Sequence, residues 1–95
     1  MITAIVLVET APSLIPEVAQ SIADLPRVHE VYSVTGDTDL IVMVRVSQHD
    51  ELADVIANHI SKVDGVLETR TYIAFQSYSR QDLDDAFDIG FGEVD

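Results

Sequence analysis

The chain has 95 residues, which is enough for one hydrophobic core and too short for two. Its 47% hydrophobic fraction is typical of a folded domain, and no apolar run approaches the length that spans a bilayer. Seventeen acidic residues against five basic ones disfavour binding to nucleic acid or to anionic membranes, and the absence of cysteine excludes disulfides, thiolate nucleophiles and the usual structural zinc sites.

The first half of the chain predicts a strand, a helix and a second strand. Residues 2–8 are rich in β-branched side chains, and they lack the basic leader and cleavage site of a signal peptide, which indicates the first strand of a soluble, cytoplasmic protein. From Ser13, a candidate N-cap, apolar residues recur three or four positions apart until Pro26 ends the predicted helix. That stripe consists of Leu14, Val18, Ile22 and Leu25. Residues 28–35 form the predicted second strand.

The second half predicts a turn, a strand, a helix and a final strand. Residues 36–39 form a four-residue turn in which Gly36 can supply a positive φ, and the nearly continuous apolar run 40–46 indicates a central strand. Ser47 and Asp50 resemble a capping box for a helix that ends near Gly65. Its apolar stripe consists of Leu52, Val55, Ile56, Ile60 and Val63. The last strand is predicted over residues 66–78, with Thr69, Thr71 and Phe75 among the side chains that share one face.

The order β-α-β-β-α-β predicts an α+β, ferredoxin-like fold, in which an antiparallel four-stranded sheet carries both helices on one face. A faint duplication supports it, because the corner at Val28 and the corner at Val63 are similar and lie about 35 residues apart. Ile41 and Met43 would leave the helix-free face apolar, so we predict a dimer that packs sheet to sheet as a dimeric α/β barrel.

Two motifs resemble the effector-binding domain of the Lrp/AsnC, or feast/famine, transcription regulators. The segment 31–40 (VYSVTGDTDL) is similar to that family's hydrophobic-to-Gly-x-x-Asp turn, and 63–73 (VDGVLETRTYI) is similar to its helix-to-strand corner. The resemblance covers residues 1–79, our predicted ligand-binding and oligomerisation domain. Within the family, the chain resembles the single-domain relatives, because its sequence contains no basic helix of the kind with which a helix-turn-helix domain contacts DNA.

The resemblance implies dimers that assemble into octamers or other rings, with small effectors, usually amino acids, bound between dimers. Gly36, Asp39, Thr69 and Thr71 match the family's site, and Asp37 and Thr38 are their neighbours. At Thr38 relatives often have an aromatic or apolar residue. The chemistry agrees, because a zwitterionic amino acid needs carboxylates, hydroxyls and backbone N–H groups close together. The resemblance implies no cofactor.

Simpler interpretations stand beside this one. The Gly-Asp-Thr-Asp segment is also an ordinary hairpin turn, and Thr69 and Thr71 are also ordinary strand formers. The histidines His29, His49 and His59 lack metal-ligand spacing, so no metal site is predicted. Residues 80–95 are predicted to be an acidic tail, although Leu83, Phe87 and Phe91 suggest that it docks on a neighbouring subunit.

Three classes of function remain open at this stage. The first is a non-enzymatic effector-binding module that acts through other proteins, by co-assembly with full-length Lrp/AsnC regulators or by sequestering an amino acid, without direct contact to nucleic acid or membrane. The second is a small dimeric α/β-barrel enzyme of the oxygenase or isomerase type, for which His29, at a predicted corner, is the only candidate acid or base. The third is a purely structural assembly unit.

Overall fold

The structure is a computed structural model that describes residues 1–80 of the chain. Its strands are β1 (Ile2–Thr10), β2 (Val28–Ser33), β3 (Leu40–Val46) and β4 (Val66–Ile73). Helix α1 (Ile15–Ala23) follows the 3-10 turn η1 (Pro12–Leu14), and helix α2 (His49–Asp54) continues through η2 (Val55–His59), a π-helical turn, into the 3-10 turn η3 (Ile60–Lys62). The predicted acidic tail lies outside the described residues, apart from Arg80.

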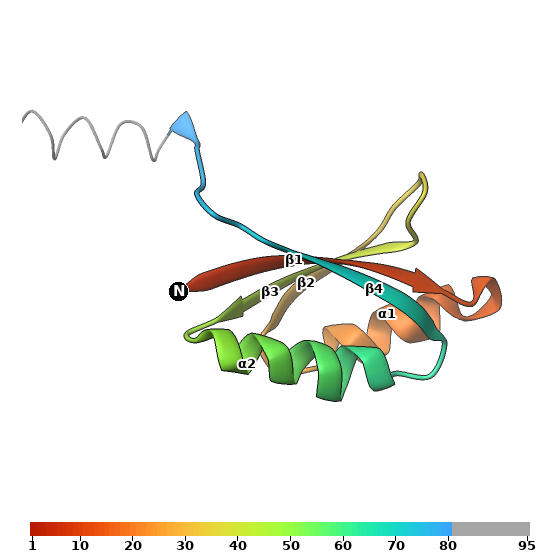
Figure 1. Ribbon diagram of the computed structural model, residues 1–95. Coiled ribbons are helices and arrows are strands. Elements are labelled where there is room, and N and C mark those ends of the chain that lie inside the picture. The colour runs from red at the N-terminus through yellow and green to blue at the C-terminus, as the bar shows by residue number, and fades with distance from the viewer. Residues whose placement is uncertain (81–95) are drawn as a thin grey trace, which may run out of the picture.

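The four strands form one sheet in the order β2-β3-β1-β4, and every neighbouring pair is antiparallel. Figure 1 shows the sheet with α1 and α2 both beneath it. This topology confirms the predicted ferredoxin-like α+β fold. In the described chain, no helix is long and apolar enough to cross a membrane.

The core lies between the sheet and the helices. Along β1 and β3 every second side chain is buried, because successive side chains of a strand point to opposite faces. The register places Val6 opposite Val42 and Val8 opposite Leu40, so both strands present the same face to Val18 and Ile22 of α1 and to the second helix. The apolar run 40–46 is thus explained by burial on both faces of β3. The helices bury one face completely, and Ile41 and Met43 on the other face are partly buried.

The opposite face of the sheet has no helix over it, and we call it the open face. Its apolar residues, identified from the strand register and burial, are Ile5, Leu7, Tyr32, Ile41, Met43 and Tyr72. Tyr32 and Tyr72 are about half exposed, at 47% and 54%. The prediction that the helix-free side is apolar is therefore confirmed, whereas a single chain does not test the predicted dimer.

Both predicted helix caps were wrong by one or two positions. Ser13 lies inside η1, because Pro12 starts a 3-10 turn that the Leu14 N–H to Ala11 C=O bond of 2.9 Å closes, and α1 begins only at Ile15. The second cap uses Glu51 rather than Asp50. The Glu51 carboxylate accepts the backbone N–H groups of Ser47 (2.7 Å) and Gln48 (2.9 Å), since the longer side chain can reach back over the first turn.

Each helix returns to the sheet through a corner with a left-handed residue. Gly65 has φ +98° immediately before β4, as predicted, and Arg27 has φ +71° immediately before β2. The two corner carbonyls are used alike, because Arg27 C=O accepts the Arg45 N–H (3.1 Å) and Gly65 C=O accepts the Ala11 N–H (2.8 Å). The internal repeat therefore pairs Val28 with Val66, and the sequence alignment with Val63 was three residues out of register.

Two segments rise from the sheet on its open side in Figure 1. One is the hairpin loop between β2 and β3, where Gly36 adopts φ +127° and the Val34 N–H donates to Asp39 C=O (3.1 Å). The other is the chain after β4. The last strand ends at Ile73 rather than Tyr78, so Phe75 and Tyr78 do not belong to the sheet.

Candidate functional site

The hairpin loop is fastened to the end of β1 by two of the predicted site residues. The Asp39 carboxylate accepts the Thr10 N–H at 2.9 Å, and the Asp39 N–H donates to Val8 C=O at 3.3 Å. Thr38 is 8% exposed, and its hydroxyl donates to the same Val8 carbonyl at 3.4 Å. Asp39 and Thr38 therefore bond the backbone groups of Val8 and Thr10, where the pairing of β1 with β3 ends. Turn propensity alone did not predict this structural role.

The two threonines of β4 lie across β1 from the hairpin. Thr69 pairs with Val8 and Thr71 pairs with Val6, so their hydroxyls share one face as predicted, on the helix side of the sheet. Thr69 is partly buried and Thr71 is exposed. Within residues 1–80 neither hydroxyl has a hydrogen-bond partner in the protein, and the same is true of the Asp37 carboxylate. These three groups remain available to a ligand.

The structure thus brings the six predicted residues to the same end of the sheet without joining them into one pocket. Val8 is the common neighbour, bonded to Thr38 and Asp39 on one side and paired with Thr69 on the other. The tip of the hairpin with Gly36 rises on the open side, whereas Thr71 lies on the helix side (Figure 1).

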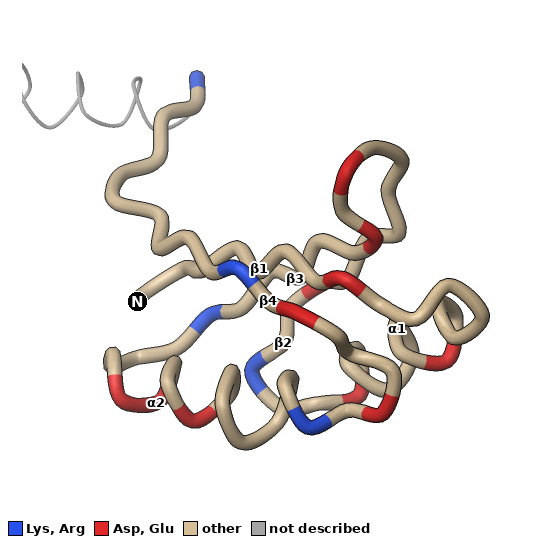
Figure 2. The backbone as a smooth tube through the Cα atoms, turned by 45° about the vertical axis from the view of Figure 1, so that its right-hand side comes forward, with Lys and Arg blue, Asp and Glu red and all other residues tan. Residues whose placement is uncertain are grey.

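Negative charge dominates this end of the molecule. Asp37, Asp39, Glu9 and Glu68 lie on the hairpin or on the adjoining strand ends, and Figure 2 shows acidic positions there with little basic charge among them. The ion pair from Arg70 to Glu9, 3.6 Å long, neutralises one of them. Such a field favours a cationic group such as an ammonium, while hydroxyls and backbone N–H groups suit its carboxylate.

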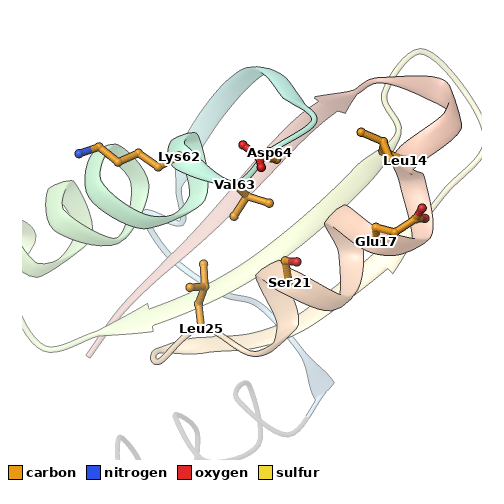
Figure 3. A pocket seen from close by; sticks show the side chains of 7 residues that line it. All are labelled: Leu14, Glu17, Ser21, Leu25, Lys62, Val63 and Asp64. Atoms are coloured by element: carbon orange, nitrogen blue, oxygen red, sulfur yellow. The ribbon is translucent and has the colours of Figure 1, made fainter.

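Two of the hollows in the described part of the chain are well defined, and neither of these two includes a predicted site residue. The first, of about 420 Å³, lies between α1 and the corner before β4; its lining is Leu14, Glu17, Ser21, Leu25, Lys62, Val63 and Asp64. In Figure 3 Leu25 and Val63 face each other across it, whereas Lys62 extends away. The second, of about 330 Å³, lies under the segment that follows β4.

A polar cluster that sequence reasoning missed joins the second helix to the first corner. Asp54 accepts a hydrogen bond from the Asn58 amide (2.8 Å) and lies 3.4 Å from His59 Nε2 and 3.7 Å from Arg27 Nη1. The Asn58 hydrogen bond, with smaller contributions from the charges of His59 and Arg27, lowers the pKa of Asp54. The i to i+4 spacing of Asp54 and Asn58 was a readable signal, whereas the approach of Arg27 depends on the tertiary fold.

The only histidine considered as an acid or base lies in a strand rather than at a corner. His29 falls within β2 at a break in the β2–β3 register between Val28 and Glu30, and its side chain is 51% exposed. Its Nε2 is 3.8 Å from the Glu30 carboxylate. Across residues 1–80, no three His, Asp or Glu side chains cluster as metal ligands would.

The sequence pattern of the family described as "Lrp/AsnC ligand binding domain" matches residues 3–83. The HTH-type transcriptional regulator LysM of Saccharolobus solfataricus is 35% identical over 78 residues, which are 81% of this chain and 54% of LysM. The chain spans between 39% and 54% of the length of the curated relatives it matches, and these are transcriptional regulators.

Solved structures give the same result. TTHA0845 from Thermus thermophilus superimposes with a TM-score of 0.80 at 44% identity, over 84% of this chain and 100% of that one. A feast or famine regulatory protein from M. tuberculosis, solved with L-methionine, superimposes with a TM-score of 0.71 at 25% identity, over 85% of this chain and 55% of that one. On these matches, which extend over nearly all of the described fold, the chain belongs to the Lrp/AsnC ligand-binding domain family.

Proposed function

We propose that this chain binds an amino acid or a similar small effector and assembles into dimers and rings of dimers. The observation that carries the proposal is the arrangement around Val8, where Asp37, Thr69 and Thr71 offer unused polar groups on two sides of one strand end. The relative solved with L-methionine supports an amino acid as the effector class.

In this proposal the effector site is completed between copies. The hairpin supplies the Asp37 carboxylate for an ammonium group, and Thr69 and Thr71 supply hydroxyls for a carboxylate. Because these groups lie on different sides of the sheet in one chain, the hairpin of one dimer would face the threonines of another. Residues 1–79 form the binding and assembly domain and 80–95 an acidic tail, and full-length Lrp/AsnC regulators are candidate partners.

We also infer that the module is not an enzyme. An acid or base for catalysis must reach its substrate within a shielded site, and His29 stands on an exposed strand position beside Glu30. That the curated relatives are transcriptional regulators supports a role in regulation.

Calorimetric titration with each of the twenty amino acids at millimolar concentration tests the binding. We expect one or a few to bind, and both Thr71→Val and Asp37→Asn to weaken the binding at least about tenfold. Thr71→Val loses a hydrogen bond to a charged ligand worth about 1.5 kcal/mol or more, and Asp37→Asn loses the negative charge that strengthens the bond to an ammonium group. Neither side chain has a partner among residues 1–80, so both variants should keep the wild-type stability.

Asp64→Asn is the matched control, because Asp64 is an exposed carboxylate that lines the hollow beside α1 and should not affect binding. A flat response to all twenty amino acids would contradict the effector proposal. Light scattering on the same samples tests assembly, and a monomer at every concentration would contradict the oligomeric part.

A further inference from the structure

The chain after β4 continues into residues 74–80, which we call the arm, and residues 74–79 belong to neither a helix nor a strand. Its first residue is still tied to the sheet, because the Ala74 N–H donates to Thr3 C=O at 2.8 Å. Beyond that point Figure 1 shows the chain climbing away from the sheet on its open side. Phe75 is 99% exposed and Tyr78 is 73% exposed. An aromatic side chain left wholly in water at the base of an ordered segment indicates a contact that a single chain does not provide.

The arm is not packed against its own sheet. A hollow of about 330 Å³ lies at its base, lined by Met1, Thr3, Arg45 and residues 74–77. Phe75 borders this hollow yet stays exposed, so the side chain does not fill it. Within residues 1–80, the hollow is therefore unfilled and the Phe75 ring is uncovered.

The reach of the arm suits the open face. Seven extended residues span up to about 23 Å, at roughly 3.3 Å each. The outer strands of a four-stranded sheet lie about 14 Å apart, at roughly 4.8 Å between neighbours. An arm of this length can cross the full width of such a sheet.

Charge also permits the approach. The chain as a whole carries a net charge of -12, but the arm (AFQSYSR) contains no acidic residue, and Arg80 is its only charged side chain. It can therefore lie against another acidic copy without adding repulsion. In addition, the arm and the hairpin rise on the same side of the sheet, so a second copy seated on the open face would meet both (Figure 1).

We propose that the arm of each copy packs across the open face of a second copy, with Phe75 inserted among Ile5, Ile41 and Met43 of that copy. The exchange is reciprocal, as the two-fold symmetry of a homodimer requires. This inference rests on the proposed self-association and adds to it a specific partner surface and an anchor residue.

Photo-crosslinking tests the exchange directly. Phe75 is replaced by p-benzoylphenylalanine, which keeps an aromatic side chain at this exposed position, in the full-length chain. Equal amounts of ordinary and ¹⁵N-labelled protein are mixed, allowed to exchange subunits, irradiated and mapped by mass spectrometry. We expect crosslinks between light and heavy chains that map to β1 or β3 at the open-face residues. Crosslinks only within one chain, or only to the helices, would overturn the proposal.

The strength of the contact is tested by dilution in the analytical ultracentrifuge. Each dimer has two arms, so we expect Phe75→Ala to raise the dimer Kd about 100-fold, about 2.8 kcal/mol at 1.4 kcal/mol per tenfold. Leu67→Ala removes another exposed apolar side chain, at the far end of β4, and should change Kd by less than about threefold. Circular dichroism should show both variants folded, because neither side chain belongs to the core.

The outcomes separate this inference from the proposed function. A wild-type dimer that Phe75→Ala leaves unchanged overturns the arm exchange and leaves self-association intact. A wild-type chain that is monomeric in light scattering overturns both.

Discussion

Replacing Gly65 by alanine should destabilise the fold more than any other single-methyl addition at a glycine of the described chain. At φ +98°, an L-residue is strained by about 1–2 kcal/mol. The added Cβ would also lie 2.7 Å from Val18 Cγ2 and 3.1 Å from Leu14 Cδ1, and Val18 is a buried core residue. Overpacking of this kind costs about 1–3 kcal/mol, so we expect a total loss of about 2–5 kcal/mol in the free energy of unfolding.

Urea denaturation followed by circular dichroism, at one fixed protein concentration, measures this loss. Gly36→Ala is the matched control, because Gly36 also has a positive φ, +127°, but an added Cβ would meet nothing within 4 Å. Gly36→Ala should cost about 1–2 kcal/mol, the strain alone. Equal losses at the two glycines would refute the argument from steric contact.

A double-mutant cycle gives a second check. Val18→Ala removes the atom that the new Cβ would meet. The double variant should therefore lose about 1–2 kcal/mol less free energy of unfolding than the two single losses added together. Strict additivity would show that the corner relaxes away from Val18, and the clash would then not explain the loss.

Two further predictions concern strain and ionisation. Arg27→Gly should be about 1 kcal/mol more stable than Arg27→Ala in the same urea assay, because both lose the exposed ion pair to Asp54 but only glycine relieves φ +71°; equal stability would mean that this corner is not strained. The hydrogen bond from the Tyr32 hydroxyl to the Glu30 carboxylate (2.6 Å) raises the pKa of Tyr32 above its ordinary value of 10.0. The pair therefore stabilises the fold below pH 10, and this contribution is lost as pH rises through the folded-state pKa. Ultraviolet titration should show one tyrosine ionising late in the wild type and not in Glu30→Gln, and identical curves would contradict the hydrogen bond.

The sequence was most informative where periodicity and backbone chemistry act over short distances. The nearly continuous apolar run 40–46 predicted β3 with its observed bounds, and the left-handed position of Gly65 followed from its place after a helical stripe. The pairing of Thr69 and Thr71 on one face also follows from the two-residue period of a strand. All these features depend on near neighbours in the chain.

Features that depend on distant partners could not be predicted in the same way. The left-handed conformation of Arg27 is imposed by a corner whose carbonyl bonds Arg45, and an arginine gives no sign of it. The Asp39 carboxylate looked like a ligand group, yet its partner in the chain is the Thr10 N–H, 29 residues away. The early end of β4 has the same cause, because the Ala74 N–H already bonds Thr3 C=O and β1 begins at Ile2, so little of β1 is left to pair with residues after Ala74.

The order of strands has a consequence for how the chain folds as it is synthesised. β1 emerges first from the ribosome but lies second from the edge of the sheet, and Ala4 pairs with Val44 on one side and with Ile73 on the other. Until β3 emerges both edges of this apolar strand are open, and until β4 emerges the second edge stays open, which is the condition that invites intermolecular pairing. A ribosome-bound chain that stops before β4 is therefore the species most in need of a chaperone.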